Sequence, residues 1–458
     1  MALTRRELLA APALSLGAAA RRPNILLLFP DQHRFDWTGL NRELPVRTPH
    51  LNALASRGVA FRKAVVASPL CAPSRACLAS GREYERCGVP SNQADYPLEQ
   101  TTFYRLLRDS GYHVMACGKI DLHKKTQDWG LDGKRLLGEW GYSDGIDNAG
   151  KMDAIASGAV APRDPYMAYL HGRKLAAAHV ADFRARAKEG YKATYPTPLD
   201  DDAYCDNWIG GNGRNLIEAV PRGKPWFLQV NFTGPHNPMD ITRSMESRAR
   251  DRKYPQPNRP QQFTAEEHVA IRQNYTAMVE NIDRWVGAFV DQLKKRGELD
   301  NTLVVFSSDH GEMLGDHGKW GKTLPYQQSI GVPLVVAGPG VAKGVKSDAL
   351  VSHIDLTATF LEAAGAPVPH GMDSRGLGKL LAGRTTKHRE VVRSGLGDWR
   401  LAYDGRWKLI TGFDPNGPKG AVGREPVLYD LANDPLENEN LAVKAPGELE
   451  RLMRYLRS

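Results

Sequence analysis

Carboxylate, amide and imidazole side chains follow two of the apolar runs in the sequence. They are Asp31 and Gln32 after the run at residues 24–29, and Asp309 and His310 after the run at residues 302–306. Oxygen donors of this kind are the ligands that a hard divalent cation binds, and the cation can then activate a nucleophile. Each residue alone could equally be a helix cap or a turn residue. The metal-site hypothesis therefore depends on their meeting at one place.

Two further apolar runs are followed by side chains that could act on an anionic group. Lys119 follows the run at residues 112–116, and His236 lies in Gly-Pro-His-Asn-Pro after the run at residues 226–232. An ammonium group can counter charge that develops in a transition state, and an imidazole can donate a proton or a hydrogen bond to a leaving oxygen. The alternative for His236 is a residue that only belongs to a rigid, proline-rich turn.

The segment Cys-Ala-Pro-Ser-Arg-Ala-Cys-Leu-Ala-Ser-Gly at residues 71–81 predicts a short helix with a reactive start. Pro73 suits the first turn of a helix, and Gly81 suits its end. Cys71 would then lie at the helix N-terminus, where free N–H groups and the helix dipole favour an anion. The alternative is a small cysteine that is buried for packing alone.

The elements that must position these residues are predicted by apolar periodicity. The run at residues 24–29 is bounded by Pro23 and Pro30 and is typical of a strand that is buried on both faces. A further apolar run lies at residues 333–337. Helical patterns lie between several of the apolar runs. Alternating strands and helices predict an α/β fold with a large, mostly parallel sheet covered by helices on both faces. The carboxyl ends of such strands meet in one crevice, where ligands bind.

The clearest helix and the domain limits can also be predicted. Thr264 and Glu267 form a capping box at the start of an amphipathic pattern that Gly297 ends. From about residue 375 the pattern changes to short mixed segments, with apolar stretches at residues 407–410 and 427–429 and a closing helix near 447–457. We therefore expect a catalytic domain at 21–374 and a small antiparallel α+β subdomain at 375–458. Residues 138–223 are rich in Gly, Asp and Pro and are interpreted as insertions over one face.

The segment at residues 71–81 resembles the sulfatase signature, Cys-x-Pro-Ser-Arg followed by Leu-x-Ser-Gly, at every fixed position. The similarity extends over nearly the whole chain. Matching segments lie at residues 23–31, 307–312, 318–326, 331–334 and 428–441. The chain is thus similar to the formylglycine-dependent (type I) sulfatases of the alkaline phosphatase-like superfamily, and the resemblance implies an alkaline phosphatase-like fold.

The resemblance implies a modified nucleophile and a metal. In the family the signature cysteine, here Cys71, is oxidised by a maturation enzyme to Cα-formylglycine, whose hydrated aldehyde attacks sulfur. One divalent metal, commonly calcium, would be held by Asp31, Gln32, Asp309 and His310 together with the modified Cys71. Arg75 would brace the formylglycine. Lys119, His123, His236 and Lys322 would bind the sulfate oxygens or protonate the leaving oxygen.

Three departures from the family pattern stand out. Gln32 replaces an aspartate that many members have, which removes one formal negative charge. The usual Gly-Lys-x-His is replaced by Gly118-Lys119-Ile120-Asp121-Leu122-His123, so either His123 or Asp121 takes the histidine's place. Gln327 replaces a common glutamate. None of these changes removes the nucleophile or the metal core.

The leading functional hypothesis is a sulfuric ester hydrolase that acts on a sulfated carbohydrate or an aryl sulfate. A phosphonate monoester or phosphodiester hydrolase of the same superfamily is the alternative, because such enzymes also use formylglycine. A third possibility, a secreted binding protein on an inactive sulfatase scaffold, is disfavoured because Cys71, Arg75, Asp31 and Asp309 are all present.

Composition excludes several other classes. With 41% hydrophobic and 25% charged residues, the chain is neither disordered, collagenous nor a coiled coil. Its net charge of +9 is not gathered into basic blocks, so nucleic-acid binding is not indicated, although the field would attract an anionic substrate. Five cysteines without a CxxC pair argue against a zinc site or a disulfide framework. No apolar run of about 18 residues follows the N-terminus, so no membrane span is expected.

The first twenty residues predict an export signal. Arg5 and Arg6 precede a short, weakly apolar stretch and the small residues 17–20. This order is typical of a cleaved signal peptide of the twin-arginine type at residues 1–20, which would make the protein periplasmic or secreted. The alternative is a frayed amphipathic N-terminus.

Overall fold

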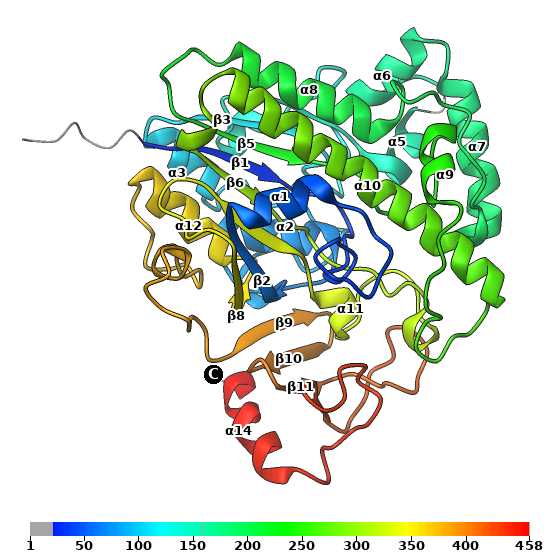
Figure 1. Cartoon of the computed structure of the whole chain (residues 1–458), viewed down its shortest axis with the longest axis vertical. Coiled ribbons are helices and arrows are strands. Elements are labelled where there is room, and N and C mark those ends of the chain that lie inside the picture. Colours follow the sequence, from blue (N-terminus) through cyan, green and yellow to red (C-terminus); the bar gives the residue numbers. More distant parts are fainter. Residues whose placement is uncertain (1–21, 159, 458) are drawn as a thin grey trace, which may run out of the picture.

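The computed structural model describes residues 22–158 and 160–457, so the predicted export segment lies outside the described residues. A large sheet of eight strands forms the centre of the molecule, with strand order β4-β3-β5-β1-β6-β7-β2-β8 (Figure 1). Its strands are β1 (Asn24–Leu28), β2 (Gly58–Val65), β3 (His113–Gly118), β4 (Asp144–Asp147), β5 (Trp226–Asn231), β6 (Thr302–Phe306), β7 (Leu334–Ala337) and β8 (Val345–Ser352).

The sheet is parallel except at β7, which runs antiparallel to both of its neighbours. The central strand β1 pairs with β5 on one side and with β6 on the other. Leu28 lies opposite Val230 and opposite Phe306 in the register, so the carboxyl ends of these three strands lie next to each other. The predicted mostly parallel sheet is confirmed, and the segments that follow β5, β1 and β6 must share one edge.

Helices cover both faces of the large sheet because the strands are apolar on both sides. In β1, Ile25 and Leu27 belong to one buried cluster, and Leu26 and Leu28 belong to another. The first cluster includes residues of α2 (Cys71–Ser80), α3 (Phe103–Asp109) and α12 (Asp355–Ala364). The second includes residues of α1 (Pro49–Ser56), α8 (Cys205–Ala219) and α10 (Ala265–Lys295). This arrangement confirms the predicted three-layer architecture.

Two helices begin and end where the sequence predicts. Thr264 and Glu267 form the capping box of α10, with the Thr264 side chain accepting the Glu267 N–H at 3.2 Å. The helix continues to Lys295, just before Gly297. Helix α2 begins at Cys71, and the residue that follows it, Gly81, is in the left-handed region with a φ of 64°. Both helices therefore follow from local capping and from glycine's tolerance of positive φ.

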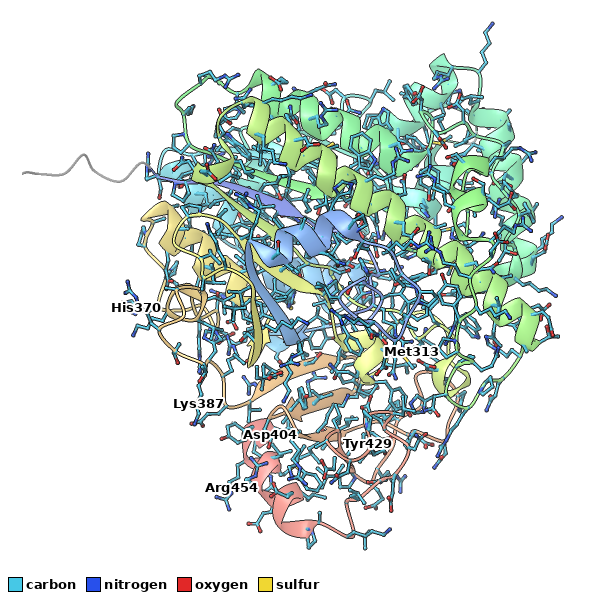
Figure 2. The ribbon with its side chains drawn as sticks, viewed as in Figure 1. Met313, His370, Lys387, Asp404, Tyr429 and Arg454 are labelled. Carbon is cyan, nitrogen blue, oxygen red and sulfur yellow. The ribbon has the colours of Figure 1, made fainter. Side chains whose placement is uncertain are left out.

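A small antiparallel sheet and a terminal helix form the C-terminal part, at one end of the molecule (Figure 1). Its elements are β9 (Val392–Leu396), β10 (Trp399–Tyr403), β11 (Trp407–Thr411), β12 (Val427–Asp430) and α14 (Pro446–Arg457). Ala402, Leu409 and Leu428 pack against α14, while Leu401 and Tyr429 on the opposite face join the core of the large sheet. Tyr429, Asp404 of the β10–β11 turn and Arg454 of α14 are labelled in Figure 2. The predicted α+β character is confirmed, and the exact boundary at residue 375 stays a prediction.

The region expected to be irregular insertions is largely helical. Among the described residues of 138–223, four α-helices form besides the end of α4, and α8 packs directly on β3 and β5. Strands β2, β4 and β8 were not expected from the apolar pattern. Aspartates bound β4, and β8 begins with the exposed residues Val345 and Lys346. No helix among the described residues is long and apolar enough to cross a membrane. The remaining helices are α4 (Leu137–Trp140), α5 (Gly150–Gly158), α6 (Pro165–Gly172), α7 (Ala176–Glu189), α9 (Arg243–Ala249), α11 (Gln327–Ile330) and α13 (Gly378–Leu381).

Candidate active site

The Cys71 thiol lies at the centre of a buried polar cluster. Cys71 is the first residue of α2 and is only 2% exposed. Its Sγ lies 3.4 Å from His310 Nε2, 3.9 Å from Asp31 Oδ1 and 3.2 Å from Lys322 Nζ. The segments that follow β1 and β6 therefore converge on the first residue of α2, as the sequence analysis predicted.

The two aspartates reach the cluster because adjacent parallel strands end beside each other. Asp31 follows β1, and Asp309 follows β6; both are fully buried. The backbone N–H of Gln32 donates to Asp309 Oδ1 at 2.9 Å, which joins the two strand ends directly. His310 directly follows Asp309 in the chain, and its Nε2 lies 3.6 Å from Asp31 Oδ1. The topology alone thus assembles two carboxylates and one imidazole.

The geometry of these side chains fits a single divalent cation. Donor atoms of Asp31, Cys71, Asp309 and His310 all lie within 4.8 Å of one another, and all four residues are buried. Two ligands on opposite sides of one hard cation are about 4 to 5 Å apart, given metal–oxygen distances of about 2.0 to 2.6 Å. Two carboxylates with one imidazole are also an oxygen-rich donor set. The residues present therefore fit the metal that the family implies.

Gln32 is held in a fixed orientation beside the cluster. Its φ of 70° is uncommon for a residue with a side chain. The side-chain Nε2 donates to Glu312 Oε2, while Oε1 accepts from Lys322 Nζ at 2.6 Å. Because a carboxylate can only accept, Glu312 fixes which end of the amide is nitrogen. The amide oxygen therefore faces Lys322, whose ammonium group also contacts the Cys71 thiol.

Glu312 organises more than the amide. Its Oε1 accepts the backbone N–H groups of Leu314 at 3.0 Å and Gly321 at 2.6 Å, and its Oε2 accepts the Tyr191 hydroxyl at 3.1 Å. The carboxylate thus ties the end of β1 to the loop that carries Lys322. Sequence analysis placed Glu312 inside a family motif but gave it no role, and Tyr191 was not singled out at all.

Arg75 and Lys119 neutralise the buried carboxylates. Arg75 Nε donates to Asp309 Oδ2 at 3.0 Å, and its Nη1 donates to Asn231 Oδ1 at 2.9 Å. Lys119 Nζ forms an ion pair with Asp31 and lies 3.1 Å from Asp121 Oδ2. Arg75 follows Cys71 by one helical turn, so the same helix presents both side chains. In this structure Arg75 braces Asp309 rather than the side chain of Cys71.

The cations control the ionisation of the cluster. Burial by itself would raise the pKa of Asp31, but Lys119, His236 and Lys322 outweigh it and hold that pKa well below its ordinary value. Burial and Asp31 would likewise raise the pKa of the Cys71 thiol, yet Lys119, Lys322 and His310 lower it well below the ordinary value. The position of the Cys71 side chain therefore favours negative charge.

His236 and Lys322 lie at the partly exposed side of the cluster. His236 follows β5, and its Nδ1 is hydrogen-bonded to the backbone carbonyl of Asn237. Burial lowers the pKa of His236, and Lys322 lowers it further, although Asp31 opposes the shift. Both residues are less buried than Asp31 or Cys71. They therefore lie where a substrate would enter.

His123 does not contact this cluster. Its Nε2 is 2.8 Å from Asp147 Oδ2, and its Nδ1 accepts the backbone N–H of Asp128 at 3.3 Å. Its ring packs against Trp129 and Trp140. Both ring nitrogens are engaged by these contacts, none of which joins His123 to the Cys71 thiol, and the expected role of His123 on the sulfate group stays a prediction. The second option that the sequence left open, Asp121, contacts Lys119 instead.

The sequence model of the family described as Sulfatase matches residues 23–366. The chain belongs to the sulfatase family. An arylsulfatase from Clostridium perfringens is 26% identical over 446 residues, covering 92% of this chain and 90% of the relative. A choline-sulfatase from Rhizobium meliloti is 27% identical over 492 residues, covering 94% of this chain and 84% of the relative. The protein is thus a sulfatase, a hydrolase of sulfate esters.

Solved structures support the fold of this sulfatase. A protein in complex with its substrate D-glucosamine-2-N,6-O-disulfate superposes with a TM-score of 0.76 at 19% identity, covering 95% of this chain and 97% of that chain. The phosphonate monoester hydrolase of Agrobacterium radiobacter gives a TM-score of 0.75 at 22% identity, covering 95% and 94%. At these identities the likeness concerns the architecture, and it confirms the predicted alkaline phosphatase-like fold.

Proposed function

We propose that this sulfatase hydrolyses sulfate monoesters of carbohydrates or aryl alcohols through Cys71 converted to Cα-formylglycine. The observation that carries the proposal is the position of Cys71 at the start of α2, with Asp31 and His310 on one side and Lys322 on the other. The hydrated aldehyde supplies an oxygen nucleophile in the place of the thiol. A site in which cations lower the pKa of the native thiol also stabilises an oxyanion there.

Asp31, Gln32, Asp309 and His310, together with the modified residue, would hold one divalent metal, which we propose to be Ca²⁺. When bound, the metal acts as a Lewis acid that polarises oxygen. Two carboxylates and an amide oxygen favour a hard cation over zinc. The chain itself prepares the ligands, since Arg75 orients Asp309 and Glu312 orients Gln32.

We propose that Lys119, Lys322 and His236 act on the sulfate group. Lys322 contacts the Cys71 thiol and Lys119 pairs with Asp31. From there both ammonium groups can hold sulfate oxygens and counter the charge that grows as the ester bond breaks. His236 faces the nucleophile position from the end of β5 and can hydrogen-bond the departing oxygen. Replacing any of the three by Ala should lower kcat about a hundredfold or more, and metal content should be unchanged.

The phosphonate and phosphodiester alternative rests on the shared fold of the Agrobacterium enzyme. Relative kcat/KM for 4-nitrophenyl sulfate, phenyl 4-nitrophenylphosphonate and bis(4-nitrophenyl) phosphate distinguishes the two functions. Sulfate ester preference supports the proposal, and a large preference for either phosphorus ester contradicts it. A panel of sulfated sugars then separates carbohydrate from aryl substrates.

The decisive experiment combines mass spectrometry of the Cys71 peptide with turnover. We expect formylglycine at position 71 in protein co-expressed with a maturation enzyme, and a loss of several orders of magnitude in turnover for Cys71→Ala and Cys71→Ser, as for a removed covalent nucleophile. Wild-type turnover in Cys71→Ala would falsify the mechanism. Cys205→Ala, a buried cysteine of α8 away from the cluster, is the matched control.

We also propose that the protein is exported by the twin-arginine route and acts in the periplasm or outside the cell. The Arg5-Arg6 pair supports this. Protein recovered from the native host should lack residues 1 to about 20. Changing Arg5-Arg6 to Lys-Lys should retain the protein inside the cell, and an intact N-terminus on native protein would contradict the proposal.

A further inference from the structure

Three lysines and two aromatic residues form a rim next to the Cys71 cluster. Of the three lysines, the mechanism above uses only Lys322. We define the lysine rim as Lys319, Lys322 and Lys419, flanked by Tyr191 and Trp320. Lys319 and Lys322 belong to the loop after β6, Tyr191 to the helical insertion, and Lys419 to the loop between β11 and β12 of the C-terminal sheet. The rim therefore joins three distant segments of the chain.

The contacts place Lys419 over the loop that carries Lys322. Its Nζ donates to the backbone carbonyl of Trp320 at 2.8 Å. A Cβ built on Gly321 would lie 3.2 Å from Lys419 Nζ and 3.4 Å from the Tyr191 hydroxyl oxygen, so both groups lie against the residue before Lys322. In return Lys319 Nζ donates to the carbonyl of Gly417 at 2.9 Å. The two loops thus hold each other through reciprocal lysine–carbonyl bonds.

The Glu312 carboxylate compensates the positive charge of the rim only in part. Among residues 22–158 and 160–457, none of the three ammonium groups forms an ion pair with a carboxylate. Lys419 is exposed at the surface, yet partial desolvation lowers its pKa. Glu312 opposes this shift, and Lys322 and Lys319 lower the pKa further through like-charge repulsion. Holding like charges together costs free energy, which a bound anion would offset.

The aromatic side chains beside the lysines give the rim a second character. The rings of Tyr191 and Trp320 have centroids 4.6 Å apart, and Trp320 also packs against Phe263 and His268. Tyr191 is fixed at its hydroxyl by Glu312. A rigid aromatic pair next to cations suits a ring-shaped group that carries negative charge.

We propose that Lys419 is a specificity-determining residue that binds a second anionic group, a carboxylate or a further sulfate, on the leaving-group side of the substrate. The inference rests on the proposed function, because it takes the sulfate that is cleaved to lie against Cys71 and Lys322. Lys419 then contacts a charge that is not cleaved. The C-terminal sheet contributes this residue and so takes part in substrate selection.

The test compares matched substrates that differ by one charge. One pair is 4-sulfooxybenzoate and its methyl ester; the other is resorcinol disulfate and 3-methoxyphenyl sulfate. For each compound, kcat/KM of the formylglycine-bearing wild type is divided by that of Lys419→Met, so that leaving-group reactivity cancels. We expect this ratio to be about three- to tenfold larger for the doubly charged member of at least one pair, as for a solvent-exposed ion pair.

Three comparisons support the interpretation of this ratio. Lys419→Arg should restore the preference, and added salt should reduce it because exposed charges are screened. Lys343→Met is the matched control, an exposed lysine in the turn before the edge strand β8, whereas the site follows the central strands β1 and β6. A larger ratio in the benzoate pair identifies the second anion as a carboxylate, and a larger ratio in the resorcinol pair identifies it as a sulfate.

The outcomes separate this inference from the proposed function. Equal losses for charged and neutral members of both pairs would show that Lys419 only anchors its loop to Trp320, and no loss at all would also overturn the inference. If none of the four aryl sulfates and no sulfated sugar is hydrolysed by protein whose Cys71 is converted, the proposed function fails instead. Calorimetric affinities of Cys71→Ala for the same pairs, with and without Lys419→Met, then test the charge preference without turnover.

Discussion

At the scale of single residues, the site works by holding opposite charges in close, buried contact. Asp31 and Asp309 would be costly to bury alone, and Lys119 and Arg75 compensate them. The Cys71 thiol contacts Asp31, His310 and Lys322, so one side chain lies against two candidate metal ligands and against an ammonium group. A metal that joins this set changes the balance of charge, and its removal should be measurable.

We expect chelation to abolish turnover and Ca²⁺ to restore it. The binding is separately visible in unfolding, because a ligand at a hundred times its Kd stabilises the folded state by about 2.7 kcal/mol. Calcium should therefore raise the Tm of the chelated protein, and Asp31→Asn should remove most of that rise. An unchanged Tm, or a stoichiometric zinc pair found by elemental analysis, would contradict a single calcium site.

The departure from the family's Gly-Lys-x-His pattern leads to a second prediction at this scale. Asp121 lies 3.1 Å from Lys119 and, with Asp31, raises the pKa of that lysine against the effect of burial. Asp121→Asn should mislocate or loosen Lys119 and lower kcat about tenfold or more. His123→Gln should lower stability through the lost Asp147 contact while leaving kcat per folded molecule within about twofold. A large loss of kcat in His123→Gln, with little loss in Asp121→Asn, would assign the catalytic role to His123 instead. Circular dichroism and kcat together make the comparison.

At the scale of elements, what the sequence predicts depends on how local the cause is. The run Ile25 to Leu28 predicts β1 because both of its faces are buried. Helix α10 follows from its capping box. Strands β4 and β8 carry polar residues at the sheet edges, and only pairing with a neighbouring strand makes them strands.

The site shows the same limit. Asp31 and Cys71 could be predicted because their motifs are continuous in sequence. Glu312 contacts Gln32 across 280 residues, and Lys419 contacts Trp320 across 99. No local pattern reports such pairs, since topology alone brings them together. The same holds for Asn231, which accepts from Arg75 across 156 residues.

A buried carboxylate at the start of α12 predicts acid sensitivity. Asp355 accepts from Arg389 Nε at 2.8 Å and from the backbone N–H of Arg375 at 2.9 Å. Burial would raise the pKa of Asp355, but Arg389 and His388 lower it to about 2. A folded-state pKa below the unfolded value of 3.8 gives stability that is complete above pH 4 and lost as the pH falls toward 2.

The corresponding loss is about 2 kcal/mol of unfolding free energy over that pH window. Asp355→Asn should cost about 3 to 5 kcal/mol at neutral pH, because it leaves the buried Arg389 guanidinium without its partner, and should flatten the acid dependence. The exposed pair Arg62–Asp348 is the control, and Asp348→Asn should cost at most about 1 kcal/mol. Urea unfolding at several pH values measures both effects; equal costs for the two variants would refute the assignment.

At the scale of the whole molecule, the small sheet contacts both the core of the large sheet and the loop that carries Lys322. Its inner face contributes Leu401 and Tyr429 to the buried cluster of the large sheet, which also contains Met313 of the segment after His310 (Figure 2). Its β11–β12 loop carries Lys419 to the rim. Substitutions that alter the contact between the two sheets should therefore change substrate binding as well as stability.

The buried pair Lys408–Glu437 is the point at which this contact can be tested. Both side chains are fully inaccessible, and they form an ion pair within the C-terminal part. Glu437 Oε2 also accepts the N–H of Gln327 at 2.7 Å, and Lys408 Nζ donates to the carbonyl of Pro325 at 3.1 Å. Both bonds end on the segment that leads from Lys322 to α11. The pair therefore fixes the small sheet to the loop of the active site.

Lys408→Met should cost about 3 to 5 kcal/mol of unfolding free energy, because it leaves the Glu437 carboxylate buried without a cation. Adding Glu437→Gln should recover most of that loss, since the amide oxygen can still accept from Gln327 and no charge remains unpaired. If the pair also positions the Lys322 loop, the double variant should unfold like the wild type yet show a raised KM for sulfate esters. A double variant no more stable than Lys408→Met alone would mean that Lys408 acts through packing of its stem, and the ion pair would then have no part in joining the two sheets.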